Sequence, residues 1–121
     1  MLPAAHRLRR SVDFERAVRR GVRAGRSTVV VHLVRDAQED EPPQVGFVVS
    51  KAVGNAVQRN RVKRRLRAAA STHLDAMPPG AHIVVRALPA SGAADYSQLD
   101  RDLMSGVARA ADRWQSREAA R

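Results

Sequence analysis

The sequence contains no cysteine at all, and aromatic residues make up only 3% of its 121 positions. Without cysteine, neither a disulfide framework nor a cysteine-ligated zinc can hold the fold, which suits a reducing compartment. Hydrophobic residues make up 44% of the chain, so we expect a core packed from Val, Leu and Ala. This length is typical of one domain, and we predict a single domain over residues 1–121.

Long apolar runs are also missing. No stretch approaches the roughly 20 residues needed to span a bilayer. The opening MLPAAHRLRR lacks the apolar segment of a secretory signal peptide. We therefore expect a soluble protein of the cytoplasm.

Acidic residues are scarce where basic residues are most frequent. Residues 1–67 hold 16 Lys and Arg against 6 Asp and Glu, whereas residues 68–121 hold 6 of each kind. The whole net charge of +10 therefore comes from the first half of the chain. Such a distribution favours a directed surface for a polyanion over a generally basic composition.

The hydrophobic pattern predicts three helices and three strands. We expect a helix capped by Ser11 and ending at Gly21, and strands at 28–35 and 45–50 that pair with each other. The later elements are a helix from about Ala56 to His73 or Leu74, a strand at 82–88, and a last helix begun by a capping box of Ser97 and Asp100. Residues 115–121 are expected to be a frayed tail. The order predicts an α+β fold in which helices cover a small sheet.

The segment KAVGNAVQRNRVKRRLR, residues 51–67, carries seven cations and no acid. On a helical wheel, one arc contains Val62, Leu66, Ala69 and Ala70. The opposite side contains Asn60, Arg61, Lys63, Arg64 and Arg67. A helix of this kind can dock its apolar arc on a sheet and present its cations outward.

Three explanations of this basic helix differ in their partner. A solvated surface helix normally mixes charges of both signs at i,i+4 positions, and this one has no acid to pair. A membrane-surface helix needs a broad apolar face with Trp, Phe or Leu to insert, which is absent here. Nucleic acid is favoured, although residue spacing alone does not distinguish DNA from RNA.

The sequence offers no obvious catalytic or metal-binding cluster. The acids Asp36, Glu39, Asp40 and Glu41 gather in one loop that we expect to be solvated. Hydrolysis of a phosphodiester by a protein usually needs carboxylates that hold metal ions, or a histidine as general acid or base. The four histidines, at positions 6, 32, 73 and 82, show no spacing typical of metal ligands. We predict no catalytic and no metal-ligating residue in this chain.

The stretch VGFVVSKAVGNAVQRNRVKRRLR, centred on Arg59-Asn60-Arg61, resembles the signature region of the bacterial ribonuclease P protein subunit. The resemblance extends to RLRRSVDFERAVRRG near the start and to HIVVRALP in the later strand, and it covers roughly residues 7–114. It implies an α/β sandwich, like one ribosomal protein domain, with an unusual left-handed strand-helix-strand crossover through the basic helix. Ordinary handedness rules predict a right-handed one.

The resemblance also implies a function and partners. Members of this family pair with a large catalytic RNA and help it to remove the 5′ leader from precursor tRNA. The expected partners are that RNA and precursor tRNA, with neither a membrane nor DNA, and the Mg²⁺ of the reaction is held mainly by the RNA. The chain would then be an accessory subunit of an endoribonuclease, with its single domain serving to bind RNA.

Site residues follow from the same resemblance, position by position. The residues implied to bind RNA are Lys51, Asn55, Arg59, Asn60, Arg61, Lys63, Arg64 and Arg67. The residues implied to line a cleft for the single-stranded leader are Phe14, Val18 and His32. Family members often carry further aromatics at positions 18 and 32, so leader stacking is expected to be weaker or differently placed here. Arg65 also stands where an apolar residue is common.

Two other functions remain as alternatives. The chain could be a non-catalytic RNA-binding protein, such as a ribosomal or assembly factor, because some ribosomal domains resemble this sandwich. It could also be a stand-alone nuclease. Dependence of activity on one particular added RNA separates the three hypotheses.

Overall fold

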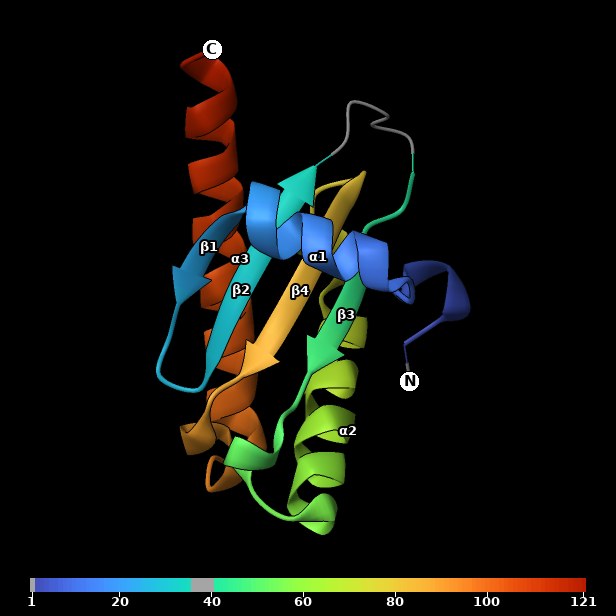
Figure 1. The fold of residues 1–121 in the computed structure, drawn as a ribbon, viewed down its shortest axis with the longest axis vertical. Coiled ribbons are helices and arrows are strands. Elements are labelled where there is room, and N and C mark those ends of the chain that lie inside the picture. Colours follow the sequence, from blue (N-terminus) through green and yellow to red (C-terminus); the bar gives the residue numbers. More distant parts are fainter. Residues whose placement is uncertain (1, 36–40) are drawn as a thin grey trace.

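The computed structural model, which describes residues 2–35 and 41–121, has a four-stranded mixed sheet with helices on both faces (Figure 1). The helix α1 (Ser11–Arg20) crosses one face, and α2 (Ala56–Thr72) and α3 (Tyr96–Ala119) cover the other. Most of the predicted tail 115–121 belongs to α3. The predicted α+β class is confirmed. None of the described helices is long and apolar enough to cross a membrane.

The strand order is β1 (Val22–Gly25), β2 (Val29–Arg35), β4 (Ala81–Ala87) and β3 (Gln44–Val48). The predicted pairing of the strands at 28–35 and 45–50 is therefore wrong, because β4 lies between them and pairs with both. The short strand β1 was not predicted. Its sequence VRAG has no run of β-branched residues, and its pairing with β2 is what gives it strand structure.

The strands β3 and β4 are parallel, and α2 connects them. Both strands point downward in Figure 1, where α2 lies behind the sheet and the chain passes from β3 leftward to β4. This arrangement makes the crossover left-handed, against the usual preference. The acidic loop that precedes β3 falls largely on residues 36–40, which are outside the described part of the chain.

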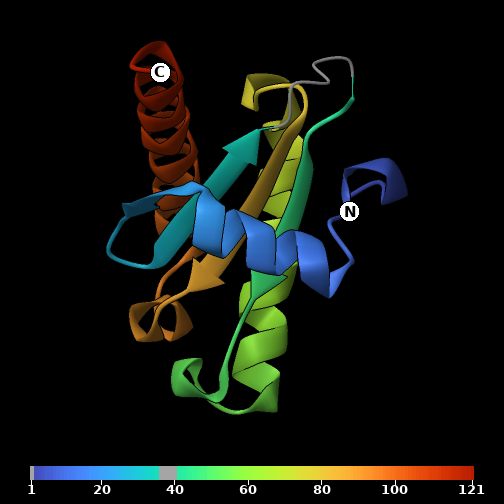
Figure 2. The same cartoon turned by 45° about the horizontal axis from the view of Figure 1, so that its top comes forward.

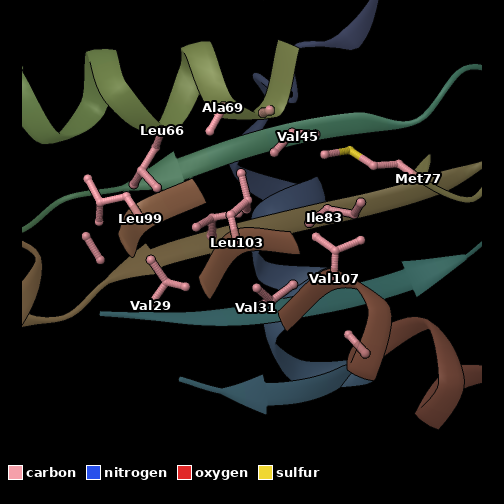
Figure 3. Close-up of a cluster of buried hydrophobic side chains, with 14 of the residues drawn as sticks. Val29, Val31, Val45, Leu66, Ala69, Met77, Ile83, Leu99, Leu103 and Val107 are labelled. Carbon is pink, nitrogen blue, oxygen red and sulfur yellow. The ribbon is translucent and has the colours of Figure 1, made fainter. Parts of the chain in front are cut away.

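Two apolar clusters hold the layers together. The larger one fills the space between the sheet and the helix pair α2 and α3, and Figure 3 shows Leu66, Leu99 and Leu103 directed at the strands. The smaller one lies under α1 and contains Leu8, Ala17, Val34 and Val84. Trp114 packs against both clusters. The expected aliphatic core is present, with the sheet separating its two parts.

The helices α1 and α3 do not begin as predicted. Ser11 is already inside α1, whose N-cap is Arg10 and has no side-chain capping bond. Ser97 lies in the first turn of α3, and the Asp95 side chain, one residue before the helix, accepts from the Gln98 N–H at 2.8 Å. An aspartate side chain accepts this capping bond as well as a serine side chain does.

Leu66 is fully buried, whereas Val57 on the same helix is 74% exposed. We predict that Leu66→Ala lowers the free energy of unfolding by about 2–5 kcal/mol, because it leaves a cavity in the larger cluster. The matched control Val57→Ala should change it by less than about 0.5 kcal/mol. Urea denaturation followed by circular dichroism measures both. Equal effects of the two substitutions would contradict the placement of α2.

Candidate nucleic-acid interface

The start of α2 is fixed by a capping box. The Asn55 side chain accepts from the Gln58 N–H at 2.9 Å, and the Gln58 side chain accepts from the Asn55 N–H at 2.8 Å. Gly54 precedes this box with a φ of 153°, and a Cβ there would lie 2.1 Å from the Gln58 Oε1. Glycine is needed at this position for both reasons. The reciprocal bonds fix the direction in which the basic helix leaves the sheet.

The buried stripe of α2 consists of the predicted residues Val62, Leu66, Ala69 and Ala70. On the opposite side, Asn60, Arg64 and Arg67 are exposed, as is Lys51 in the short turn before the helix. Among residues 2–35 and 41–121, no salt bridge involves a cation of α2. The outward side is therefore a positive surface whose repulsion a polyanion would relieve.

Three arginines of α2 are half-buried and contact carbonyl groups of the chain. The Arg59 side chain donates to the Gly54 carbonyl at 3.4 Å, and Arg61 donates to the Gly92 carbonyl at 3.3 Å. Arg65, one turn further along, donates to the Ala94 carbonyl at 3.0 Å. Arg61 and Arg65 thereby attach the basic helix to the segment that leads into α3. The charged Arg65 is accommodated at the packing edge by this bond.

A pocket of about 280 Å³ lies at the free edge of β3, beside α2. Lys63 and Arg67 line it from α2, while Arg7 and Arg9 line it from the N-terminal arm. The lining also includes the rings of Phe14 and Phe47 and contains no acid. The arm is held there by a bridge of Arg7 with Val45, in which the Leu8 N–H donates to the Val45 carbonyl at 3.1 Å.

Arg7 and Arg9 were not among the predicted site residues. They lie more than fifty residues before Lys63 in the sequence, and only the pairing of the arm with β3 brings them to α2. The run RLRR before the first helix was the available signal. Cations on two sides and aromatic rings at the pocket wall can hold a phosphate and a base.

Comparison with known proteins gives a consistent result. The family model of ribonuclease P matches residues 2–111. The ribonuclease P protein component of Streptomyces bikiniensis is 56% identical over 116 residues, which cover 90% of this chain and 94% of that protein. That of a Nocardioides species is 57% identical over 104 residues, covering 85% and 89%.

The chain belongs to the ribonuclease P family.

Solved structures of family members share the fold. The protein of Staphylococcus aureus matches with a TM-score of 0.77 at 28% identity, covering 88% of this chain and 95% of that one. A Staphylococcus aureus variant described as defective in mRNA degradation activity matches with a TM-score of 0.78 at 29% identity, covering 89% of each chain. The protein of Thermotoga maritima matches with a TM-score of 0.74 at 24% identity, covering 85% and 96%.

The three residues that the family resemblance assigns to a leader cleft occupy different surroundings. The Phe14 ring lies against the β3 backbone, where a Cβ on Gly46 would be 2.2 Å from it, and it both lines the pocket and packs on the smaller cluster. Val18 is 47% exposed on α1. His32 is 4% exposed in β2. Neither Val18 nor His32 lines the pocket of Phe14.

His32 is a buried imidazole in a positive environment. Its Nε2 has no hydrogen-bond partner within the described part of the chain, and burial lowers the pKa of His32 below its ordinary value of 6.5. The nearby charges of Arg86 and Arg23 lower this pKa further. His32 is thus held neutral, and its ring faces the same side of the sheet as Val34 and Val84, because side chains alternate along a strand.

This lowered pKa predicts a dependence of stability on pH. Below pH 6.5, His32 binds a proton in the unfolded chain, whereas in the folded protein it stays neutral until the pH falls to its lowered pKa. The free energy of unfolding should therefore fall as the pH drops from 6.5, and level off below the folded-state pKa. Urea denaturation across this range should show a smaller fall for His32→Gln than for the natural protein. An identical fall would assign the effect to the other histidines.

Proposed function

We propose that this chain is the protein subunit of a ribonuclease P ribonucleoprotein that removes the 5′ leader from precursor tRNA. The observation that carries the proposal is the outward side of α2, whose cations lack an acid partner in the described chain and continue through Lys63 and Arg67 into the aromatic pocket. Membership of the ribonuclease P family supports it. The proposed partners are the catalytic RNA and precursor tRNA, in the cytoplasm.

The exposed side chains of α2 would contact the RNA directly. Arg64 and Arg67, with Lys51 before the helix, neutralise phosphates, and a guanidinium can bind a phosphate with two parallel hydrogen bonds. Asn60 can both donate and accept at a sugar or a base edge. Because α2 is rigid and capped, these groups are arranged before binding, which reduces the entropy lost on assembly.

Asn55, Arg59 and Arg61 would act mainly by fixing that arrangement. Asn55 uses its side chain in the capping box, while Arg59 and Arg61 each use part of their guanidinium on a backbone carbonyl. Their other side-chain N–H groups would still contact RNA, except for the Arg61 Nε, which is buried. The proposal therefore keeps all the residues expected to bind RNA, and divides them into direct contacts and residues that hold α2 in place.

The pocket at the edge of β3 would hold the leader next to the cleavage region. Phe14 offers a ring for stacking on a base, and Arg7, Arg9, Lys63 and Arg67 offer donors to the adjoining phosphates. Stacking tolerates any base, so this site would accept leaders of varied sequence. Val18, which is exposed on α1, would contact the leader beyond the pocket, whereas the buried His32 would lie beneath it.

The Mg²⁺ that this reaction needs would be held by the partner RNA. Among residues 2–35 and 41–121, no three His, Asp or Glu side chains lie close enough together to hold a metal ion. No step of the proposal depends on a protein-bound metal. By neutralising phosphates, the protein would lower the Mg²⁺ concentration that the RNA requires.

The test is cleavage of 5′-labelled precursor tRNA at low Mg²⁺ with the protein alone, a bacterial ribonuclease P RNA alone, and both together. We expect cleavage at the mature 5′ end from the mixture only. An RNA-binding factor outside this enzyme would leave the RNA-alone result unchanged. Cleavage by the protein alone would indicate a stand-alone nuclease. A Staphylococcus aureus relative, whose variant is defective in mRNA degradation activity, gives a reason to test the protein alone.

Two arginines of α2 provide a matched pair for the assembly step. We predict that Arg64→Ala reduces the slope of log affinity for the catalytic RNA against log salt by roughly 0.7–0.9, the loss of one phosphate contact. Arg61→Ala should lower the affinity by a similar factor at every salt concentration, because it loosens α2 from the Gly92 carbonyl. Filter binding over a salt series separates the two results. A reduced slope for Arg61→Ala would make it a direct phosphate ligand.

A further inference from the structure

A second group of arginines meets at the opposite edge of the sheet from the pocket. The end of α1, the strand β1 and the C-terminal half of α3 come together there, on the left in Figure 1. The Arg113 guanidinium donates to the Arg23 carbonyl, and the Arg117 guanidinium donates to the Arg20 carbonyl at 2.6 Å. We call Arg20, Arg23, Arg113 and Arg117 the β1-edge cluster.

Folding creates this cluster from segments that sequence analysis treated separately. The second half of the chain is neutral as a whole, but its charges are unevenly placed along α3. Asp95, Asp100 and Asp102 lie at the start of the helix. Its last part, residues 109–119, carries Arg109, Arg113 and Arg117 against Asp112 and Glu118. Arg113 and Arg117 contact the segment 16–26, which contains five more arginines and no acid.

Structural roles account for only half of the cluster. Arg113 occupies an outward carbonyl of the edge strand β1, and Arg117 binds the last carbonyl of α1 while stacking on Trp114 at 4.5 Å. A cation at the C-terminal end of a helix is favourable. The side chains of Arg20 and Arg23, however, are exposed, and no ion pair within residues 2–35 and 41–121 involves any of the four.

The cluster is continuous with the side of the sheet that Phe14 faces. Strand alternation and pairing put Val48, Arg86, His32 and Arg23 on this side, one from each strand from β3 to β1. Val48, Arg86 and Arg23 are exposed there. The positive field of Arg86 and Arg23 reaches His32, whose pKa both lower. Four strands at a spacing of about 4.8 Å separate the two edges by only about 14 Å.

We propose that the β1-edge cluster binds the sugar-phosphate backbone of the single-stranded 5′ leader, upstream of the nucleotides held in the Phe14 pocket. The leader would pass over the exposed Val48 and Arg86 and end at Arg23 and Arg20. The β2 side chains on this face are buried beneath that path. This proposal rests on the proposed function, and assigns to the substrate a second electrostatic contact that only longer leaders reach. The occupant is single-stranded because the surface between the two edges is narrow and partly apolar.

The test compares the holoenzyme made with the natural protein and with the double variant Arg20→Gln, Arg23→Gln. These substitutions leave the carbonyl bonds made by Arg113 and Arg117 in place, so the fold is retained; thermal unfolding checks this. Affinity is measured for a long-leader precursor, a short-leader precursor and mature tRNA over a salt series. For the long leader alone, we expect weaker binding and a salt slope smaller by about 1.4, which is two contacts at 0.7 each.

The other outcomes are distinct. An equal loss of affinity for all three RNAs, or weaker assembly with the catalytic RNA, would overturn the leader assignment. Either result would indicate that the cluster binds mature tRNA or the catalytic RNA instead. No change in any affinity would overturn the proposal, because the exposed side chains of Arg20 and Arg23 would then contact no RNA. The control Arg101→Gln, at an exposed position of α3, should leave all three affinities unchanged. Failure of the natural holoenzyme to cleave would instead reject the proposed function itself.

Discussion

The docking of one strongly basic helix on an aliphatic sheet is the constraint on which the rest of the structure depends. Six cations of α2 repel one another without an internal acid, so the helix is held by other means. The narrow stripe around Leu66 supplies the apolar contact, and the capping box fixes the first turn. Carbonyl bonds from Arg61 and Arg65 attach the helix to the segment before α3. The same helix therefore both stabilises the core and carries the cations of the positive surface.

Much of this arrangement could be predicted from the sequence because it is local. The buried stripe of α2 follows from helical periodicity, and the strand runs around Val31 and Ile83 follow from their β-branched residues. Strand pairing was predicted wrongly, because adjacent runs such as β2 and β3 pair by default and nothing in them shows that β4 inserts between. The strand β1 was missed because its structure comes from its partner.

The candidate site likewise has one part that could be predicted from the sequence and one part that could not. Asn60, Arg64 and Arg67 are exposed on the side where the helical wheel placed them, since their positions depend on one element. Arg61 and Lys63, placed on the same side, are half-buried because they contact other segments. Arg7 and Arg9 line the pocket only because the N-terminal arm pairs with Val45. This contact joins distant segments, so the hydrophobic periodicity of the sequence does not predict it. The β1-edge cluster was not predicted, because residues 68–121 contain equal numbers of basic and acidic residues. That equal count does not show that arginines gather at one end of α3.

The central position of β4 has a consequence for how the chain folds during synthesis. β4 is the last strand to be made, yet it joins β2 to β3, so the sheet has no continuous ladder until residue 87 has left the ribosome. The basic helix is made before that point, without its docking surface complete. Native contacts here are mostly between distant segments, which slows folding. Until β4 is made, the cations of α2 therefore belong to a segment that lacks its complete docking surface.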